Sequence, residues 1–215
     1  IGSVIKYSDK RHSIYLLNDA SPDKRVLPLL EGFAESNQNV HLISAEENVG
    51  FIRNLNRGFN LSTNNVIILN SDTQVTENWI EKLHSCLLSD NKIGIISPLS
   101  NNATILSVPN INEPNELPEE MSVDEFAKLV EESSLRTYPR IPTAVGYCML
   151  ISRKVLTEVG MFDTIFGLGY CEENDLCLRS RNKGFEVVCC DDTYIHHYGE
   201  ASFNNITDID SRRLN

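Results

Sequence analysis

Short apolar runs alternate with helical patterns along the first half of this 215-residue chain, and the alternation limits the folds it can adopt. The pattern predicts strands at residues 14–17, 40–43, 66–69 and 93–97, and helices at 50–61 and 77–88. The run 66–69 is rich in β-branched residues, as in a strand buried on both faces of a parallel sheet. Strands that alternate with helices predict an α/β fold, with a mainly parallel sheet flanked by helices.

The chain changes character after residue 97. Residues 98–142 are irregular, and Asn, Pro and Glu dominate 109–120, but Ser122 and Glu125 form a capping-box pattern that predicts a helix start. The pattern then predicts a strand at 143–152, helices at 153–159 and 176–183, and a strand at 186–190. Residues 1–7 predict the end of a helix with no strand before it. Since such sheets usually open with a central strand, we expect a fragment or an atypical edge.

Composition excludes several classes of protein. The 19 basic and 30 acidic side chains leave a formal net charge of −11, which argues against nucleic acid as a partner, because phosphate-backbone binding needs clustered Lys and Arg. No apolar run approaches the roughly 18 residues of a membrane span, and the start lacks the layout of a signal peptide. Without any CxxC pair, the six cysteines are expected to be reduced small hydrophobes in a cytoplasmic protein: Cys86, Cys148, Cys171, Cys177, Cys189 and Cys190.

Polar residues follow two of the predicted strands. Ligands of open parallel sheets collect outside the carboxyl ends of the strands. Asp19 follows the first strand, and Asn70 and Asp72 follow the strand at 66–69. An Asp in this position either forms an Asx turn or helix cap, or serves as an oxygen ligand for Mg²⁺ or Mn²⁺. The residues alone leave both interpretations open.

The second half of the chain contains a denser acidic cluster. Glu172, Glu173 and Asp175 lie within four residues at the mouth of a predicted helix, where acids are favoured by the helix macrodipole. Three neighbouring carboxylates also repel one another, which raises a pKa or recruits a cation. His196 and His197 follow a strand-like run and suit either metal ligation or a structural role.

The order of these motifs resembles family 2 inverting glycosyltransferases of the GT-A fold, of the bacterial polysaccharide or O-antigen type. The resemblance covers about residues 1–203 and rests on seven segments: LLNDASPD (16–23), ENVGFIRNLNRGF (47–59), VIILNSDT (66–73), SPLSNNATI (97–105), TAVGYCMLISRKVLTEVGMFD (143–163), GYCEENDLCLR (169–179) and DDTYIHHYGEASF (191–203). It implies a Rossmann-like, mainly parallel sheet with a small antiparallel acceptor-side portion. It also implies one domain over 1–203 that lacks the family's first strand, and a C-terminal tail over 204–215.

The resemblance assigns roles to individual residues. Asp19 matches the acid that contacts the nucleotide base or ribose, and Arg53 and Asn56 match the helix that lines the donor pocket. Asn70, Ser71 and Asp72 stand in place of the DXD motif, which makes Asp72 the metal ligand. Glu172 and Glu173 match the Glu-Asp base motif with Glu173 in the base position, and Asp175 follows them. His197 matches the family's late histidine, a second metal ligand.

These roles predict an inverting transfer from a nucleotide-diphosphate sugar to a glycan, lipid-linked or protein acceptor. Mg²⁺ or Mn²⁺ would neutralise the diphosphate leaving group, and Glu173 would take the proton of the acceptor hydroxyl. With no transmembrane segment, any membrane association would be peripheral and use other parts of a longer protein.

Other classes of protein remain as alternatives. A non-catalytic or degenerate nucleotide- or carbohydrate-binding module is the main one. A nucleotidyltransferase or a doubly wound dehydrogenase is disfavoured, because no Gly-rich phosphate loop follows a strand.

Overall fold

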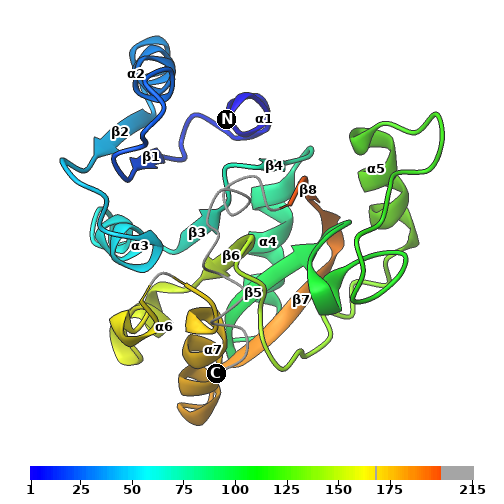
Figure 1. The fold of residues 1–215 in the computed structure, drawn as a ribbon. Helices are drawn as coiled ribbons and strands as arrows, with labels where there is room; N and C mark the ends of the chain where they lie inside the picture. Colours follow the sequence, from blue (N-terminus) through cyan, green and yellow to red (C-terminus); the bar gives the residue numbers. More distant parts are fainter. Residues whose placement is uncertain (168, 200–215) are drawn as a thin grey trace.

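The computed structural model describes residues 1–167 and 169–199 (Figure 1). The helices are α1 (Gly2–Tyr7), α2 (Val26–Ser36), α3 (Phe51–Phe59), α4 (Trp79–Ser89), α5 (Val123–Ser133), α6 (Arg153–Glu158) and α7 (Glu172–Asn182). The strands are β1 (Ile14–Asn18), β2 (Val40–Ser44), β3 (Val66–Leu69), β4 (Thr73–Gln74), β5 (Ile93–Leu99), β6 (Cys148–Ile151), β7 (Glu186–Tyr194) and β8 (His196–His197). Two 3₁₀ turns, η1 (Thr104–Leu106) and η2 (Thr164–Phe166), lie in the connections.

The central sheet has four strands in the order β3-β6-β5-β7. β5 and β7 are parallel, whereas β6 runs antiparallel to both of its neighbours, β3 and β5. The sheet is therefore mixed, with β3, β5 and β7 pointing the same way. Two smaller sheets accompany it: a parallel pair β1-β2, and an antiparallel pair β4-β8 that joins Thr73 to His197.

Two apolar layers cover the central sheet, and the alternation of side chains along β6 shows how. Cys148 and Leu150 point into the layer shared with Trp79 and Leu83 of α4. Met149 and Ile151 point to the opposite layer, which α3, α6 and α7 complete (Figure 1). A strand buried on both faces needs an apolar residue at every position, as β6 has. This doubly covered sheet is the rigid support from which the loops of the site extend.

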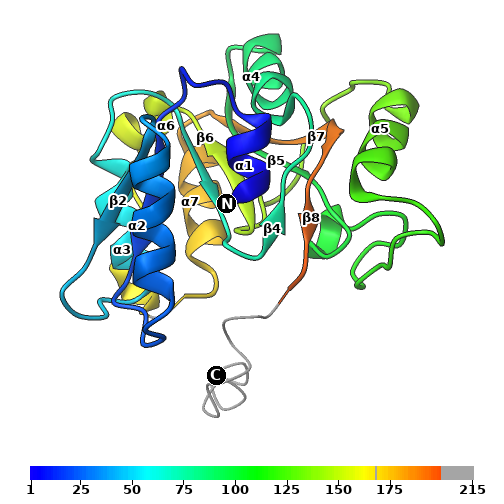
Figure 2. The ribbon, with the colours of Figure 1, turned by 90° about the horizontal axis from the view of Figure 1, so that it is seen from above.

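The β1–α2–β2 unit is much less buried. β1 and β2 pair from Ile14 with Val40 to Asn18 with Ser44, and α2 packs on β2 without burying any residue of its own. Seen from above, this unit lies on the opposite side of the central sheet from α5 (Figure 2).

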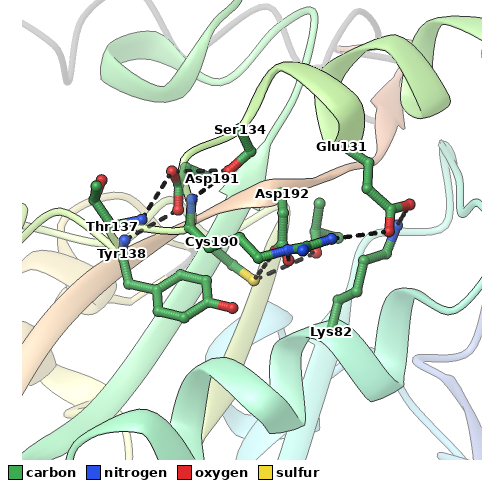
Figure 3. A network of polar contacts seen from close by, with 10 residues as sticks. Lys82, Glu131, Ser134, Thr137, Tyr138, Cys190, Asp191 and Asp192 are labelled. Atoms are coloured by element: carbon green, nitrogen blue, oxygen red, sulfur yellow. Dashed lines mark hydrogen bonds and ion pairs between the residues drawn. The ribbon is translucent and has the colours of Figure 1, made fainter.

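The insertion between β5 and β6 carries α5, whose start has the expected capping box between Ser122 and Glu125. Its C-terminal part is fixed to β7 through two acidic side chains (Figure 3). Asp191 accepts hydrogen bonds from the Ser134 hydroxyl and from the backbone N–H groups of Thr137 and Tyr138.

The second acid, Asp192, pairs with Arg136 at 3.0 Å, and the nearly buried Lys82 of α4 reaches Glu131 of α5 at 2.9 Å (Figure 3). Asp192 is almost fully buried, so removal of Arg136 would leave an uncompensated charge. The network holds the insertion against the edge strand of the sheet.

The structure confirms most predicted elements and corrects several. The run 66–69 is an edge strand in which only Ile68 is buried, rather than a strand buried on both faces. The predicted strand at 143–152 is limited to β6, because the N–H groups of Ala144 and Val145 bind the Cys177 sulfur and the Ser97 hydroxyl instead of a neighbouring strand.

Three further boundaries differ. β7 continues to Tyr194, because its acidic residues find partners in the insertion. α7 begins at Glu172 rather than at Leu176, and the helix α2 had no counterpart in the sequence prediction. The predicted tail over 204–215 lies outside the described residues.

Candidate active site

Asp72 and His197 meet where the β4-β8 pair leaves the central sheet. Asp72 directly precedes β4, His197 ends β8, and the His197 Nε2 atom lies 3.5 Å from the Asp72 Oδ1 atom. Both side chains are largely buried. The backbone supports the pair, because the N–H of Tyr198 donates to the carbonyl of Asp72 at 2.9 Å. The structure thus brings together the two residues that the sequence proposed as metal ligands.

Two asparagines after β5 fix His197. The Asn101 side chain accepts from the N–H of His197 at 2.7 Å and donates to its carbonyl at 3.1 Å. The Nδ1 atom of His197 lies 2.8 Å from the carbonyl of Asn102, so Nδ1 carries the proton and Nε2 faces Asp72. The Tyr147 ring stacks on the imidazole with 5.2 Å between centroids. The SPLSNNATI and TAVGYC motifs contain these three residues, but sequence reasoning gave them no role.

The pKa of His197 reflects two opposed influences. Burial lowers it, whereas the hydrogen bonds to Asp72 and to the carbonyl of Asn102, together with the charge of Asp72, raise it, and the net pKa is raised. In the protonated imidazole an Nε2 proton faces Asp72, and in the neutral form the Nε2 lone pair faces it instead. Within the described residues, no set of three or more His, Cys, Asp or Glu side chains comes together around a common point.

Glu172 and Glu173 begin α7 and form the second part of the site. Glu172 is buried, with 5% of its surface exposed, and Glu173 is half-buried. Across residues 1–167 and 169–199, three buried side-chain oxygens lack a hydrogen-bond partner, and two are the Oε2 atoms of these glutamates. The third is Oδ1 of Asn56. Buried polar atoms without partners are rare in proteins, and such groups concentrate at functional sites.

Burial sets the protonation of the two glutamates. Desolvation, and next the charge of Glu173, raise the pKa of Glu172 to about 7. Desolvation also raises the pKa of Glu173. Glu172 therefore titrates close to neutral pH, and the raised pKa of Glu173 makes it a stronger base than an ordinary glutamate.

The segment 143–147 connects the two parts of the site. At its start, the Thr143 hydroxyl donates to Oδ1 of Asn174 at 2.6 Å, which attaches the segment to the first turn of α7. At its end, the Tyr147 carbonyl accepts from the N–H of Asn70 at 2.8 Å, beside its stacking contact with His197. One five-residue segment thus spans from the glutamates to the Asp72–His197 pair.

Asp175 has a structural environment. It pairs with Arg179 at 2.7 Å across one turn of α7, and Arg179 also donates to the carbonyls of Val159 and Met161. The pair therefore clamps the loop after α6 onto α7. Asp175 thus has a charged partner one turn along α7, whereas Glu172 and Glu173 each have an oxygen without a partner in the described structure.

The residues matched to the donor pocket are found at α3. Asp19 accepts hydrogen bonds from the N–H groups of Val49 and Gly50, both at 2.9 Å, and so anchors the start of α3. Asn56 donates to the carbonyl of Phe162 at 2.9 Å, and Arg53 is exposed on the helix surface. The structure does not bring these three into direct contact with Asp72, and their role toward a nucleotide stays a prediction.

The cysteines are free, as expected: five are buried and only Cys171, which precedes Glu172, is exposed. Burial raises the pKa of the Cys189 thiol to about 12 and also raises the pKa of Cys148. These buried thiols therefore act as packing groups.

Comparison with known proteins shows the family. Residues 1–160 match the family described as "Glycosyl transferase family 2", so the chain belongs to it. Among curated proteins, it is 27% identical over 164 residues to the low-salt glycan biosynthesis hexosyltransferase Agl10 of Haloferax volcanii, a match that covers 72% of this chain and 50% of the relative. An uncharacterized protein of Mycobacterium tuberculosis is 26% identical over 164 residues, which cover 74% of this chain and 57% of the relative. The chain thus spans about half the length of these relatives.

Solved structures confirm the GT-A fold. GalNAc-T7 with UDP, GalNAc and Mn²⁺ superposes with a TM-score of 0.70 at 18% identity, over 91% of this chain and 39% of that one. The mannosyltransferase PcManGT from Pyrobaculum calidifontis, in complex with GDP-Man and Mn²⁺, gives a TM-score of 0.63 at 15% identity, over 94% and 52%. In the described part of the chain, no helix is both long and apolar enough to cross a membrane.

Proposed function

We propose that the chain transfers a sugar from a nucleotide-diphosphate donor to an acceptor hydroxyl, with inversion at the anomeric carbon. The observation that carries this proposal is the pair of unpartnered glutamate oxygens at the start of α7, connected by the segment 143–147 to the Asp72–His197 pair. One part of the site has groups suited to proton removal, and the other has groups suited to a cation that binds phosphate.

Asp72 and His197 fit Mg²⁺ or Mn²⁺. A carboxylate oxygen and an imidazole nitrogen point at each other across 3.5 Å, and the Asn102 carbonyl holds the imidazole with its Nε2 lone pair toward Asp72. When bound, the cation would supply Lewis-acid neutralisation of the diphosphate leaving group. The two superposed structures named above contain Mn²⁺ with UDP and with GDP-Man, which supports the same cofactor class for this chain.

Glu173 is the proposed general base. Glu173 is half-buried whereas Glu172 is buried, so more of its side chain is open to an acceptor, and its buried Oε2 atom has no hydrogen-bond partner in the described structure. Glu172 lies beside it at the preceding helix position, and its pKa, raised to about 7, lets it carry a proton while Glu173 is ionised. With the base on the face opposite the leaving group, the acceptor hydroxyl would attack the anomeric carbon in a single displacement, which inverts that centre.

Cation-dependent nucleotide binding provides the test. Titration calorimetry of UDP, GDP, TDP and CMP, each with and without Mn²⁺, should find at least one nucleoside diphosphate that binds at least tenfold more tightly with the cation. Asp72→Asn keeps the shape of the side chain and should abolish that gain. Asp23→Asn, at an exposed aspartate paired with Arg25 in the β1–α2 loop, should leave it unchanged. If no nucleotide binds, or if Asp72→Asn binds with the same cation dependence as the wild type, the proposal is wrong.

A cytoplasmic role in polysaccharide biosynthesis belongs to the same proposal, and the acceptor would be a glycan, a lipid-linked sugar or a protein. The likeness to a hexosyltransferase of glycan biosynthesis supports a glycan acceptor.

A further inference from the structure

A cavity of about 390 Å³ lies beside the Asp72–His197 pair, which is within the size range of small-molecule sites. Its lining comes from the residues after β5, from the segment 114–117 of the insertion, and from His196 and Tyr198, which flank His197. Asn101 and Asn102, which hold His197, form part of the same lining. The cavity therefore shares with the site the two asparagines that hold His197.

The far wall of the cavity is a built structure. The buried Asn115 side chain donates to the carbonyls of Asn101, Asn110 and Glu113, and its oxygen accepts from the N–H of Asn110. The N–H of Asn115 also donates to the carbonyl of Asn101 at 2.9 Å. One amide thus attaches the segment 114–117 to the loop that positions His197. An occupant of the cavity would therefore have a fixed position relative to Asp72 and His197, which we call the cation pair after their proposed role.

An aromatic platform forms the near wall. Tyr198 is 62% exposed, yet its ring is held by a hydrogen bond from its hydroxyl to Gln74 at 2.9 Å and by an edge contact with His196. An exposed aromatic ring with fixed orientation offers an apolar face for the C–H side of a sugar ring. His196 is anchored in turn by the Tyr194 hydroxyl at 3.1 Å from Nδ1.

The charge of the lining selects the ligand. Among the described residues that line the cavity, Glu116 carries a negative charge and none is Lys or Arg. The lining therefore repels phosphate and offers amide, imidazole and carboxylate groups to hydroxyls. We propose that this cavity binds a neutral saccharide unit of the acceptor, with its ring on Tyr198 and its hydroxyls on Glu116 and Asn102. This assignment rests on the proposed transferase function and adds the substrate class of its acceptor side.

Saturation-transfer NMR with the methyl glycosides of glucose, galactose, mannose and N-acetylglucosamine tests the site directly. We expect at least one glycoside to bind the wild type. Tyr198→Ala should weaken it about tenfold, because the stacking surface is lost, and Tyr198→Phe should keep the affinity within about threefold. Glu116→Gln should weaken binding several-fold, and Glu119→Gln, an exposed acid of the same insertion outside the lining, should have no effect.

Several results would overturn the assignment. They are the absence of binding by all four glycosides, equal affinity in the wild type and Tyr198→Ala, or displacement of the glycoside by inorganic phosphate. Failure of the transferase proposal is a separate result: nucleotides then fail to bind with Mn²⁺, while Tyr198-dependent glycoside binding persists. Conversely, cation-dependent UDP or GDP binding without Tyr198-dependent glycoside binding removes the saccharide site alone.

Discussion

The two acidic parts of the site have opposite polar environments. In the Asp72–His197 pair, the backbone and side chain of His197 are each held by an asparagine after β5, and a tyrosine ring covers the imidazole. In the Glu172–Glu173 pair, each side chain leaves one buried oxygen without a partner in the described structure. On the proposed function, the first arrangement would hold two cation ligands in place, and the second would keep a carboxylate available to accept a proton.

This difference follows from the energetics of buried polar groups. An unpartnered buried oxygen costs about 1–3 kcal/mol, so two of them on adjacent residues lower the stability of the fold. Hydrogen bonds to the carboxylates would restore stability but would also lower their pKa and weaken them as bases. Hydrogen bonds do not weaken the cation pair in this way, because a side chain binds a cation best when its orientation is already fixed. On the proposed function, the base role would explain why α7 keeps unpartnered oxygens while the polar groups around β8 are hydrogen-bonded.

The largest expected effect is on turnover in Glu173→Gln. The amide keeps the shape of the side chain but cannot take the acceptor proton, so transfer should fall by about 10²-fold or more while nucleotide affinity stays within about twofold. Steady-state kinetics and calorimetry on the same preparation measure the two quantities. If Glu173→Gln turns over normally while Glu172→Gln or Asp175→Asn is inactive, the base assignment is wrong by one or two residues.

How much of this comparison the sequence could predict depends on which contacts are local. The alternating apolar runs predict the α/β fold, and the acidic cluster is predicted at the mouth of a helix, although α7 begins at Glu172 rather than at Leu176. The partners of His197 are 95 and 96 residues away, at Asn102 and Asn101, and only the folded chain brings them together. No periodicity marks such contacts.

The sequence-based prediction of burial was also wrong for β3, at the edge of the sheet. A β-branched run predicts a strand but not its position in the sheet, and β3 proved to be an edge strand while β5 and β6 are buried along nearly their whole length. Strand order depends on pairing between distant segments, which the composition of one segment does not encode.

The next effect in size is on the pH dependence of stability, through Glu172→Gln. The pKa of Glu172 is raised to about 7 in the folded protein, so the folded state prefers the protonated form. The sign follows: the favourable contribution of this group is complete below its ordinary pKa, near 4.5, and is lost as the pH rises through about 7. Gln cannot ionise, so the variant should be more stable than the wild type at pH 8, by up to roughly 3 kcal/mol, and similar to it at pH 4.

Chemical denaturation at both pH values measures this difference. Glu158→Gln removes the same charge from an exposed position of α6 and serves as the matched control, with no expected pH-dependent gain. The prediction fails if the stability difference between Glu172→Gln and the wild type is the same at pH 4 and at pH 8. Such a result would show that the folded state does not favour the protonated form of Glu172. Only Glu173 would then differ from the cation pair in the way described above.

The smallest effect concerns Gly199, because a side chain at this position would meet Asn102. Gly199 has a φ of 74°, and a Cβ atom there would lie 2.3 Å from Nδ2 of Asn102, whose carbonyl fixes His197. Gly199→Ala should therefore displace the Asn102 side chain and lower stability by about 1–2 kcal/mol, chiefly through its positive φ. The disturbed loop should weaken Mn²⁺-dependent nucleotide binding several-fold, with turnover per bound donor little changed. Gly184→Ala is the matched control: its φ of 89° imposes a similar backbone cost, but no atom lies within 4 Å of the new Cβ, so it should lose stability without losing nucleotide affinity. Equal nucleotide affinity in the two variants would show that the orientation of His197 tolerates movement of Asn102, and the cation pair would then be less rigid than its hydrogen bonds indicate.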